Sequence, residues 1–129
     1  MSTTSIYLSQ SCIKTLSAVE AERKRSNQHE FNGVSQLKKM FGLKKFTKNA
    51  FFSIRGTGVK CTKNITWYDA RENNPDRTEY RLYFSGNIVM DKAQEGDNII
   101  IGVDNKNDIH VILIKSNTED HNGEILKWQ

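Results

Sequence analysis

Residues 98–103 and 109–115 read NIIIGV and IHVILIK, two apolar runs separated by the polar residues Asp104 to Asp108. Because nearly every position in both runs is apolar, we expect two strands at the centre of a sheet, buried on both faces. Turn-forming residues occupy all five positions between the runs, which predicts a hairpin loop there. Within the second run, His110 is expected to be an outward-facing strand residue.

Strand patterns also dominate the preceding part of the chain. Aromatic-rich or alternating sequence predicts strands over residues 50–55, 60–68 and 78–84, and the turn Gly56-Thr57-Gly58 joins the first two into a hairpin. The clearest helix is Val34 to Phe41, with Asn32 and Gly33 at its start and Gly42 after its end. Residues 13–25 fit either a helix or a strand that leads into a basic loop. The expected fold class is therefore mainly β (α+β).

The length and composition indicate one domain. The chain has 129 residues, of which 36% are hydrophobic and two are cysteines. Cys12 and Cys61 lack paired metal-site spacing, and we expect both to be buried thiols.

The sequence contains no apolar stretch of membrane-spanning length and no secretory signal. We expect a protein of the cytoplasm that does not bind membranes.

Charge is divided unevenly along the chain. Residues 1–65 hold 12 Lys and Arg against 3 Asp and Glu, a net charge of +9, whereas residues 66–129 hold 7 against 12, a net charge of −5. Clustered cations of this kind favour contact with a polyanion such as nucleic acid. The alternative is that the unlike charges simply interleave in the folded domain.

Two polar segments carry side chains suited to contact with DNA. The first segment combines cations with hydroxyl, amide and imidazole groups: Arg23, Lys24, Arg25, Ser26, Asn27, Gln28 and His29. The second, residues 68–81, contains Arg71, Asn73, Asn74, Arg77 and Arg81. Arginine pairs bidentately with guanine and asparagine with adenine, so the second segment suits readout of bases in the major groove. A solvated basic turn is the alternative for the first segment.

Acidic residues lie within the second segment: Asp69, Glu72, Asp76 and Glu79. They are expected either to hold the arginines in one orientation or to accept a hydrogen bond from cytosine. Ordinary surface ion pairs would give the same composition, and each exposed pair would contribute less than about 1 kcal/mol.

Two other classes of function remain as alternatives. Asp91, followed after twelve residues by Asp104-Asn105-Lys106, imitates the spacing with which some nucleases hold magnesium near a phosphate. This pattern is short and common, and the residues around Asp104 have the character of a loop. The third class is a protein-interaction module that docks on a nuclease domain through residues 34–41.

Several segments occur in an order and spacing that carry a family resemblance. They are Ile13-Lys14-Thr15-Leu16-Ser17-Ala18, Ser26-Asn27-Gln28-His29-Glu30-Phe31-Asn32-Gly33, Trp67-Tyr68-Asp69-Ala70-Arg71, Arg77-Thr78-Glu79-Tyr80-Arg81 and Lys115-Ser116-Asn117-Thr118-Glu119-Asp120. Together, from about Cys12 to Trp128, the chain resembles the N-terminal effector-binding domain of EcoRII-type type II restriction endonucleases.

The resemblance implies a DNA-binding pseudobarrel of about seven strands with a few short flanking helices. Two arms would grip the major groove, the first at residues 23–30 and the second at residues 68–81, and residues 13–22 would form a strand. In this family a separate C-terminal domain cuts DNA with magnesium, and the N-terminal domain binds an effector copy of the site. We therefore expect part of a larger enzyme, with no catalytic residue, metal or other cofactor in this domain.

The expected partner is double-stranded DNA, bound sequence-specifically. We expect Arg71, Asn73, Asn74 and Arg77 to read bases, and Arg23, Lys24, Arg25, Lys60 and Lys63 to hold phosphates. The remaining expected contacts are Ser26, Asn27, Gln28, His29, Tyr68, Glu79 and Arg81. A C-terminal nuclease domain of the parent protein is the second expected partner, and the expected location is the bacterial cytoplasm.

Overall fold

The computed structural model describes residues 7–21, 30–32, 35–71, 76 and 78–129. The strands in chain order are β1 Gln10–Thr15, β2 Glu30–Asn32, β3 Phe46–Ile54, β4 Lys60–Asp69, β5 Tyr80–Phe84, β6 Asn98–Val103 and β7 Ile109–Ile114. The described helices are α1 Ala18–Ala21, α3 Ser35–Phe41 and α4 Ile88–Asp91. The prediction of a mainly β fold with short helices is confirmed.

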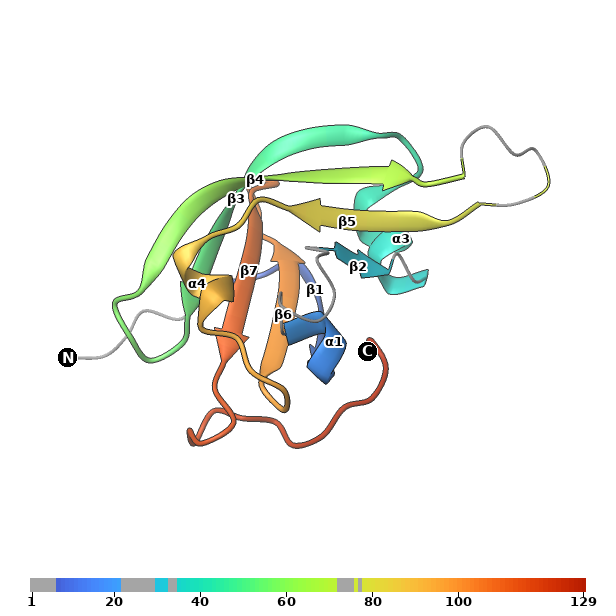
Figure 1. Cartoon of the computed structure of the whole chain (residues 1–129). Coiled ribbons are helices and arrows are strands. Elements are labelled where there is room, and N and C mark those ends of the chain that lie inside the picture. The colour runs from blue at the N-terminus through green and yellow to red at the C-terminus, as the bar shows by residue number, and fades with distance from the viewer. Residues whose placement is uncertain (1–6, 22–29, 33–34, 72–75, 77) are drawn as a thin grey trace.

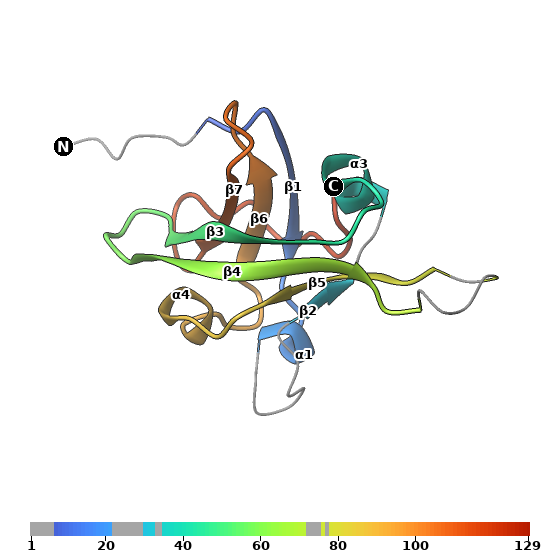
Figure 2. The ribbon, with the colours of Figure 1, turned by 90° about the horizontal axis from the view of Figure 1, so that it is seen from above.

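All seven strands belong to one mixed sheet in the order β1-β6-β7-β3-β4-β5-β2. Neighbouring strands are antiparallel except β3 and β7, which are parallel. The sheet curls into a half-barrel with the short helices beside it (Figures 1 and 2). Strongly twisted sheets of this size curl in this way because each strand is rotated against its neighbour.

The two apolar runs form the centre of one half of the sheet, as predicted. β6 lies between β1 and β7, and β7 lies between β6 and β3. Ile99, Ile101 and Leu113 are fully buried. The loop between the two strands is also confirmed, because Asp104 N donates to Asp108 O at 3.0 Å and closes it.

The predicted hairpin is confirmed and is longer than expected. β3 begins at Phe46, and eight residue pairs join it to β4, from Phe46 with Trp67 to Ser53 with Lys60. β4 then pairs with β5, whose buried residues Tyr80, Leu82 and Phe84 alternate as the sequence predicts. Trp67, the bulkiest of the fully buried side chains among the described residues, lies on β4.

The helix predicted over residues 34–41 is confirmed as α3. Leu37 on its inner side is fully buried, and Gly42 follows with a φ of 80°, the left-handed conformation typical of the residue after a helix. The expected cap at Gly33 lies outside the described residues.

The expectation of a strand over residues 13–22 is wrong beyond Thr15, because β1 ends there and α1 follows. Ser17 Oγ accepts a hydrogen bond from Glu20 N at 3.3 Å, and Glu20 Oε1 accepts one from Ser17 N at 3.0 Å. This reciprocal pair is a capping box, which starts a helix by satisfying N–H groups of its first turn. The sequence allowed either a strand or a helix here, and the described residues contain both: the strand β1 up to Thr15 and then the helix α1 from Ala18.

The two cysteines differ in their surroundings. Cys12 is buried, and burial raises its pKa to about 12, so its thiol is unreactive. Cys61 is only partly buried, which corrects the expectation of a buried thiol. A surface pocket of about 420 Å³, also lined by Phe52 and Lys60, opens beside it.

No helix of the described part of the chain is long and apolar enough to cross a membrane.

The C-terminal segment covers the open edge of β1. Ile13 and Gln129 exchange two backbone hydrogen bonds of 3.0 Å, and Trp128 packs edge-on against Phe31. The fully buried Asn98 joins this segment to the sheet. Its amide nitrogen donates to Thr15 Oγ1 at 3.0 Å, and its Oδ1 accepts from Asn122 N at 2.6 Å.

Replacing Asn98 with alanine should destabilise the domain by about 1–3 kcal/mol, because the fully buried amide loses its hydrogen bonds to Thr15 Oγ1, Gly123 O and Asn122 N. Urea denaturation would measure the change. Asn64→Ala, at an exposed position of β4, is the matched control and should stay within about 0.5 kcal/mol of the unaltered chain. Equal effects of the two changes would contradict the role given to Asn98.

Candidate nucleic-acid interface

The second arm, residues 68–81, begins at the paired ends of β4 and β5, which project past the rest of the sheet (Figure 1). Tyr68 pairs with Arg81 and Asp69 with Tyr80 at its base. The pairing extends one step further because Ala70 N donates to Glu79 O at 2.7 Å. A ladder of this length makes the described base of the arm a rigid two-stranded ribbon.

A single carboxylate oxygen of Asp69 ties the two strands of the arm together. Asp69 Oδ1 accepts hydrogen bonds from Arg71 N at 2.9 Å and from Glu79 N at 2.8 Å. These bonds, together with the positive charge of Lys38, lower the pKa of Asp69 below its ordinary value. The charged form of Asp69 is thus the form that holds the arm.

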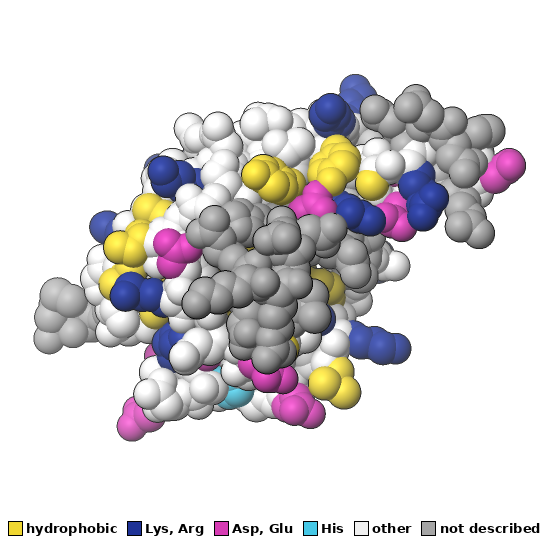
Figure 3. Space-filling view, viewed as in Figure 1, with side chains coloured by type: hydrophobic (Ala, Val, Ile, Leu, Met, Phe, Trp, Pro, Cys, Tyr) yellow, Lys and Arg dark blue, Asp and Glu magenta, His cyan; other side chains and the backbone are white. Residues whose placement is uncertain are grey.

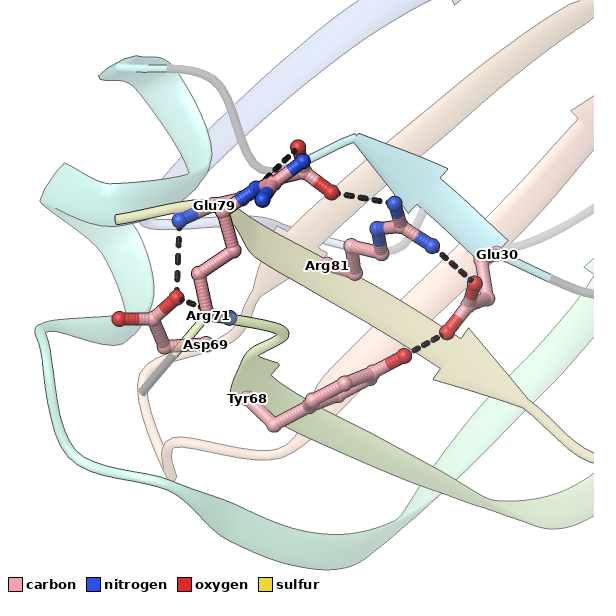
Figure 4. A network of polar contacts seen from close by, with 6 residues as sticks. All are labelled: Glu30, Tyr68, Asp69, Arg71, Glu79 and Arg81. Atoms are coloured by element: carbon pink, nitrogen blue, oxygen red, sulfur yellow. Dashed lines mark hydrogen bonds and ion pairs between the residues drawn. The ribbon is translucent and has the colours of Figure 1, made fainter. Parts of the chain in front are cut away.

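Glu79 holds two arginines with its two carboxylate oxygens (Figure 4). Its Oε1 accepts from Arg71 Nε at 3.3 Å, and its Oε2 accepts from Arg81 Nη2. The hydrogen bond from Arg81 is the larger cause, and that from Arg71 the second, of a lowered pKa for Glu79. Both guanidinium groups are therefore fixed from the same side chain.

The same network reaches Glu30, at the end of the predicted first arm. Arg81 Nη1 donates to Glu30 Oε1 at 3.2 Å, and the hydroxyl of Tyr68 donates to Glu30 Oε2. Burial, followed by the hydrogen bond to Glu30, raises the pKa of Tyr68 to about 12, so the hydroxyl stays protonated. β2 is thereby fixed to the base of the second arm through side chains as well as through the sheet.

The two arginines differ in how much of each is exposed. The side chain of Arg71 is 46% exposed and that of Arg81 is 30% exposed, and the Nε of Arg81 is buried with no hydrogen-bond partner. Figure 3 shows acidic and basic side chains lying next to one another along the base of the arm. Arg71 is thus the more accessible of the two, whereas Arg81 joins Glu30 to Glu79.

Many of the predicted contacts lie outside the described residues. These are Arg23, Lys24, Arg25, Ser26, Asn27, Gln28 and His29 of the first arm, and Asn73, Asn74 and Arg77 of the second. The described part of the predicted set brings together Tyr68, Arg71, Glu79 and Arg81.

Lys60 and Lys63 lie apart from this group. Both are exposed, but Lys60 is the first residue of β4 and Asp69 is its last. A strand rises about 3.3 Å per residue, so about 30 Å of strand separates Lys60 from the arm. Lys60 and Lys63, expected from the sequence to hold phosphates, therefore lie at the end of the β3–β4 hairpin that is distant from the second arm.

The residues of the alternative nuclease site are also separated. Asp104 directly follows the last residue of β6. Asp91 lies near the other end of this strand, because the carbonyl of its neighbour Lys92 accepts a hydrogen bond from Lys115, and Lys115 follows Ile114, the partner of the first residue of β6. The six residues of β6 span about 20 Å. Among the described residues, no three His, Cys, Asp or Glu side chains are grouped to hold a metal ion.

Asp104 instead organises its own loop. Its Oδ1 accepts from Lys106 N at 2.8 Å and from Asp108 N at 3.0 Å, and its Oδ2 contacts His110 Nε2 at 2.9 Å. The hydrogen bond to His110 is the main cause of a lowered pKa for Asp104. The side chain of His110, on the outer face as expected, is only 12% exposed, and the ring of Phe51 packs against it at a tilt, with the ring centroids 5.3 Å apart.

The arm base should be sensitive to acid. Because folding lowers the pKa of Asp69, its charged form stabilises the arm above pH 3.8, its ordinary pKa, and this contribution is lost as the pH falls through the lowered value. The amide protons of Arg71 and Glu79 should therefore shift together in an NMR titration, with a midpoint below 3.8. Asp69→Asn should abolish this step, and a midpoint at or above the ordinary value would contradict the assignment.

No protein-family model matches this chain, and no curated protein matches its sequence. The resemblance to the EcoRII effector-binding domain therefore stays a prediction from the segments that carry it.

Proposed function

We propose that this chain is a sequence-specific double-stranded-DNA-binding domain that serves as the specificity or effector-binding module of a type II restriction endonuclease. The observation that supports this most directly is the contact of Glu79 with Arg71 at the base of the second arm. It fixes a half-exposed guanidinium on a protruding ribbon. The resemblance of the chain to the EcoRII-type domain supports the restriction role.

The shape of the arm suits the major groove. A two-stranded β-ribbon fits this groove, which is about 12 Å wide, and arginine is the side chain that most often reads guanine there. Arg71 has five N–H donors, and its described contact with Glu79 occupies only the one on Nε. In the proposed complex the remaining donors of Arg71 face guanine O6 and N7.

The carboxylates of the arm base serve orientation in this proposal. Asp69, Glu79 and Glu30 outnumber the two arginines of the network, so its formal charge is −1. Such a network does not attract phosphate, but a guanidinium that is already fixed loses less conformational entropy when it binds. The network thus favours discrimination between sequences over general affinity.

The direct test is binding of short duplexes in EDTA. The chain should enrich a sequence from a random duplex pool, bind it without metal, and lose affinity steeply as salt rises, because bound cations release counterions from the phosphates. It should leave the duplex uncut when magnesium is restored. Failure to enrich any duplex, or affinity independent of salt, would overturn the proposal.

Arg71→Ala should weaken binding of the enriched site by about 1–3 kcal/mol and reduce discrimination against a scrambled duplex, as expected for a lost bidentate contact. Arg55→Ala removes the same charge just after β3, at the end of the hairpin distant from the arm. It should affect both duplexes equally and slightly. Fluorescence anisotropy with the two duplexes compares the variants, and equal losses would refute the assignment of Arg71.

The variant Glu79→Gln distinguishes the effect of Glu79 on the orientation of Arg71 from its effect on the net charge of the chain. The change raises the net charge by one, so a purely electrostatic binder would hold every duplex more tightly. If Glu79 orients Arg71, the enriched site should instead lose its advantage over the scrambled duplex by several-fold. The ratio of the two dissociation constants is the measurement, and an unchanged ratio would show that Glu79 does not act on readout.

A further inference from the structure

A second basic region lies in the part of the chain that has no acidic residue. Residues 31–68 contain no Asp or Glu and eight cations: Lys38, Lys39, Lys44, Lys45, Lys48, Arg55, Lys60 and Lys63. The first five lie on α3, the loop after it and the start of β3, and we call them the lysine platform. No ion pair joins a platform lysine to a carboxylate within the described ranges.

An aromatic cluster holds the platform against the base of the second arm. Phe41 packs edge-on against Phe46 and lies 5.4 Å from the Trp67 ring, and Trp67 stacks on Tyr80 at 5.2 Å. Lys38 lies over the Tyr80 ring, with its Nζ 5.4 Å from the ring centroid. Trp67 and Tyr80 belong to β4 and β5, so the platform is packed directly onto the two strands that form the arm.

The loop after α3 is fixed by two side chains of the same strands. Trp67 Nε1 donates to Gly42 O at 2.9 Å, and Tyr80 Oη donates to Leu43 O at 2.8 Å. The two lysines that follow, Lys44 and Lys45, are exposed. Because these two hydrogen bonds fix the backbone just before Lys44 and Lys45, the position of both lysines relative to the arm base is fixed as well. The loop lies outside both predicted arms.

Most of the network of Figure 4 lies on the face of the arm base opposite to the platform, whereas Asp69, which pairs with Tyr80, lies on the platform's face. Adjacent residues of a strand point to opposite faces, so Trp67, which contacts the platform, and Tyr68, which contacts Glu30, face opposite ways. Lys38 is close enough for its charge to lower the pKa of Asp69. One face of the arm base therefore carries Glu30 and Glu79, and the other is bordered by lysines that form no ion pair within the described ranges.

We infer that the lysine platform binds the sugar–phosphate backbone beside the groove that the second arm enters. The inference rests on the proposed function. A ribbon in the major groove has a phosphate strand along each side, so cations at the base of the ribbon meet phosphates without reading bases. Lys60 and Lys63 lie about 20–30 Å of strand away from Asp69 and are less well placed for the same backbone.

Three double variants of the full chain, each with two positive charges removed, test the inference. Lys44→Ala/Lys45→Ala changes the platform, Lys60→Ala/Lys63→Ala changes the distant end of β4, and Lys92→Ala/Lys106→Ala is the control at exposed positions outside both regions. Binding of the enriched duplex and of a scrambled duplex is measured from low to moderate salt. Thermal denaturation confirms that each variant is folded.

The platform variant should bind both duplexes more weakly by the same factor, and the slope of log affinity against log salt should become shallower by about 2. The control should keep the slope of the unaltered chain. An unchanged slope for the platform variant, or a loss confined to the Lys60 and Lys63 variant, would overturn the inference while the proposed function stands. Absence of duplex binding by the unaltered chain would overturn the proposed function and the inference with it.

Discussion

The parallel pairing of β3 with β7 joins the two halves of this sheet. One half, β1-β6-β7, comes largely from the C-terminal part of the chain, and the other, β3-β4-β5-β2, from the middle. Five residue pairs connect them, from Ala50 with Ile109 to Ile54 with Leu113. Every residue of this junction on the inner face is apolar and buried, so hydrophobic burial supplies the free energy that keeps the halves together. The position of the second arm depends on it, because β4 and β5 are anchored to the rest of the molecule through β3.

The sequence predicts the regular elements well because they depend on local pattern. The apolar runs of β6 and β7, the alternation of Tyr80, Leu82 and Phe84, and the glycine after α3 are visible in a few consecutive residues. The capping box of Ser17 and Glu20 is equally local, and it would have shown that a helix follows β1. The expected strand over residues 13–22 came from the resemblance, and the local signal was the better guide.

The candidate site was less predictable because its contacts join distant parts of the chain. Glu30 lies 38 residues from Tyr68 and 51 from Arg81, and Trp67 reaches Gly42 across 25 residues. Composition identified the second arm as a place where carboxylates and arginines mix, but it could not show which carboxylate holds which arginine. It also could not show that Lys60 lies at the distant end of β4, or that the residues around Lys44 pack against the base of the second arm.

Specificity and affinity are opposed demands on a charged surface, and the arm base separates them in space. A lysine next to Arg71 would strengthen attraction to any phosphate, but it would leave the guanidinium free to choose among several acceptors. Glu79 restricts Arg71 and in return adds negative charge where a polyanion would approach. In the proposed complex, the platform lysines, which form no ion pair within the described ranges, compensate for that charge on the other face of the same strands without contacting Arg71. Because Trp67 and Tyr80 pack the platform onto these strands, the proposal makes the balance between attraction and discrimination depend on the packing of the arm base and not on the total charge of the chain.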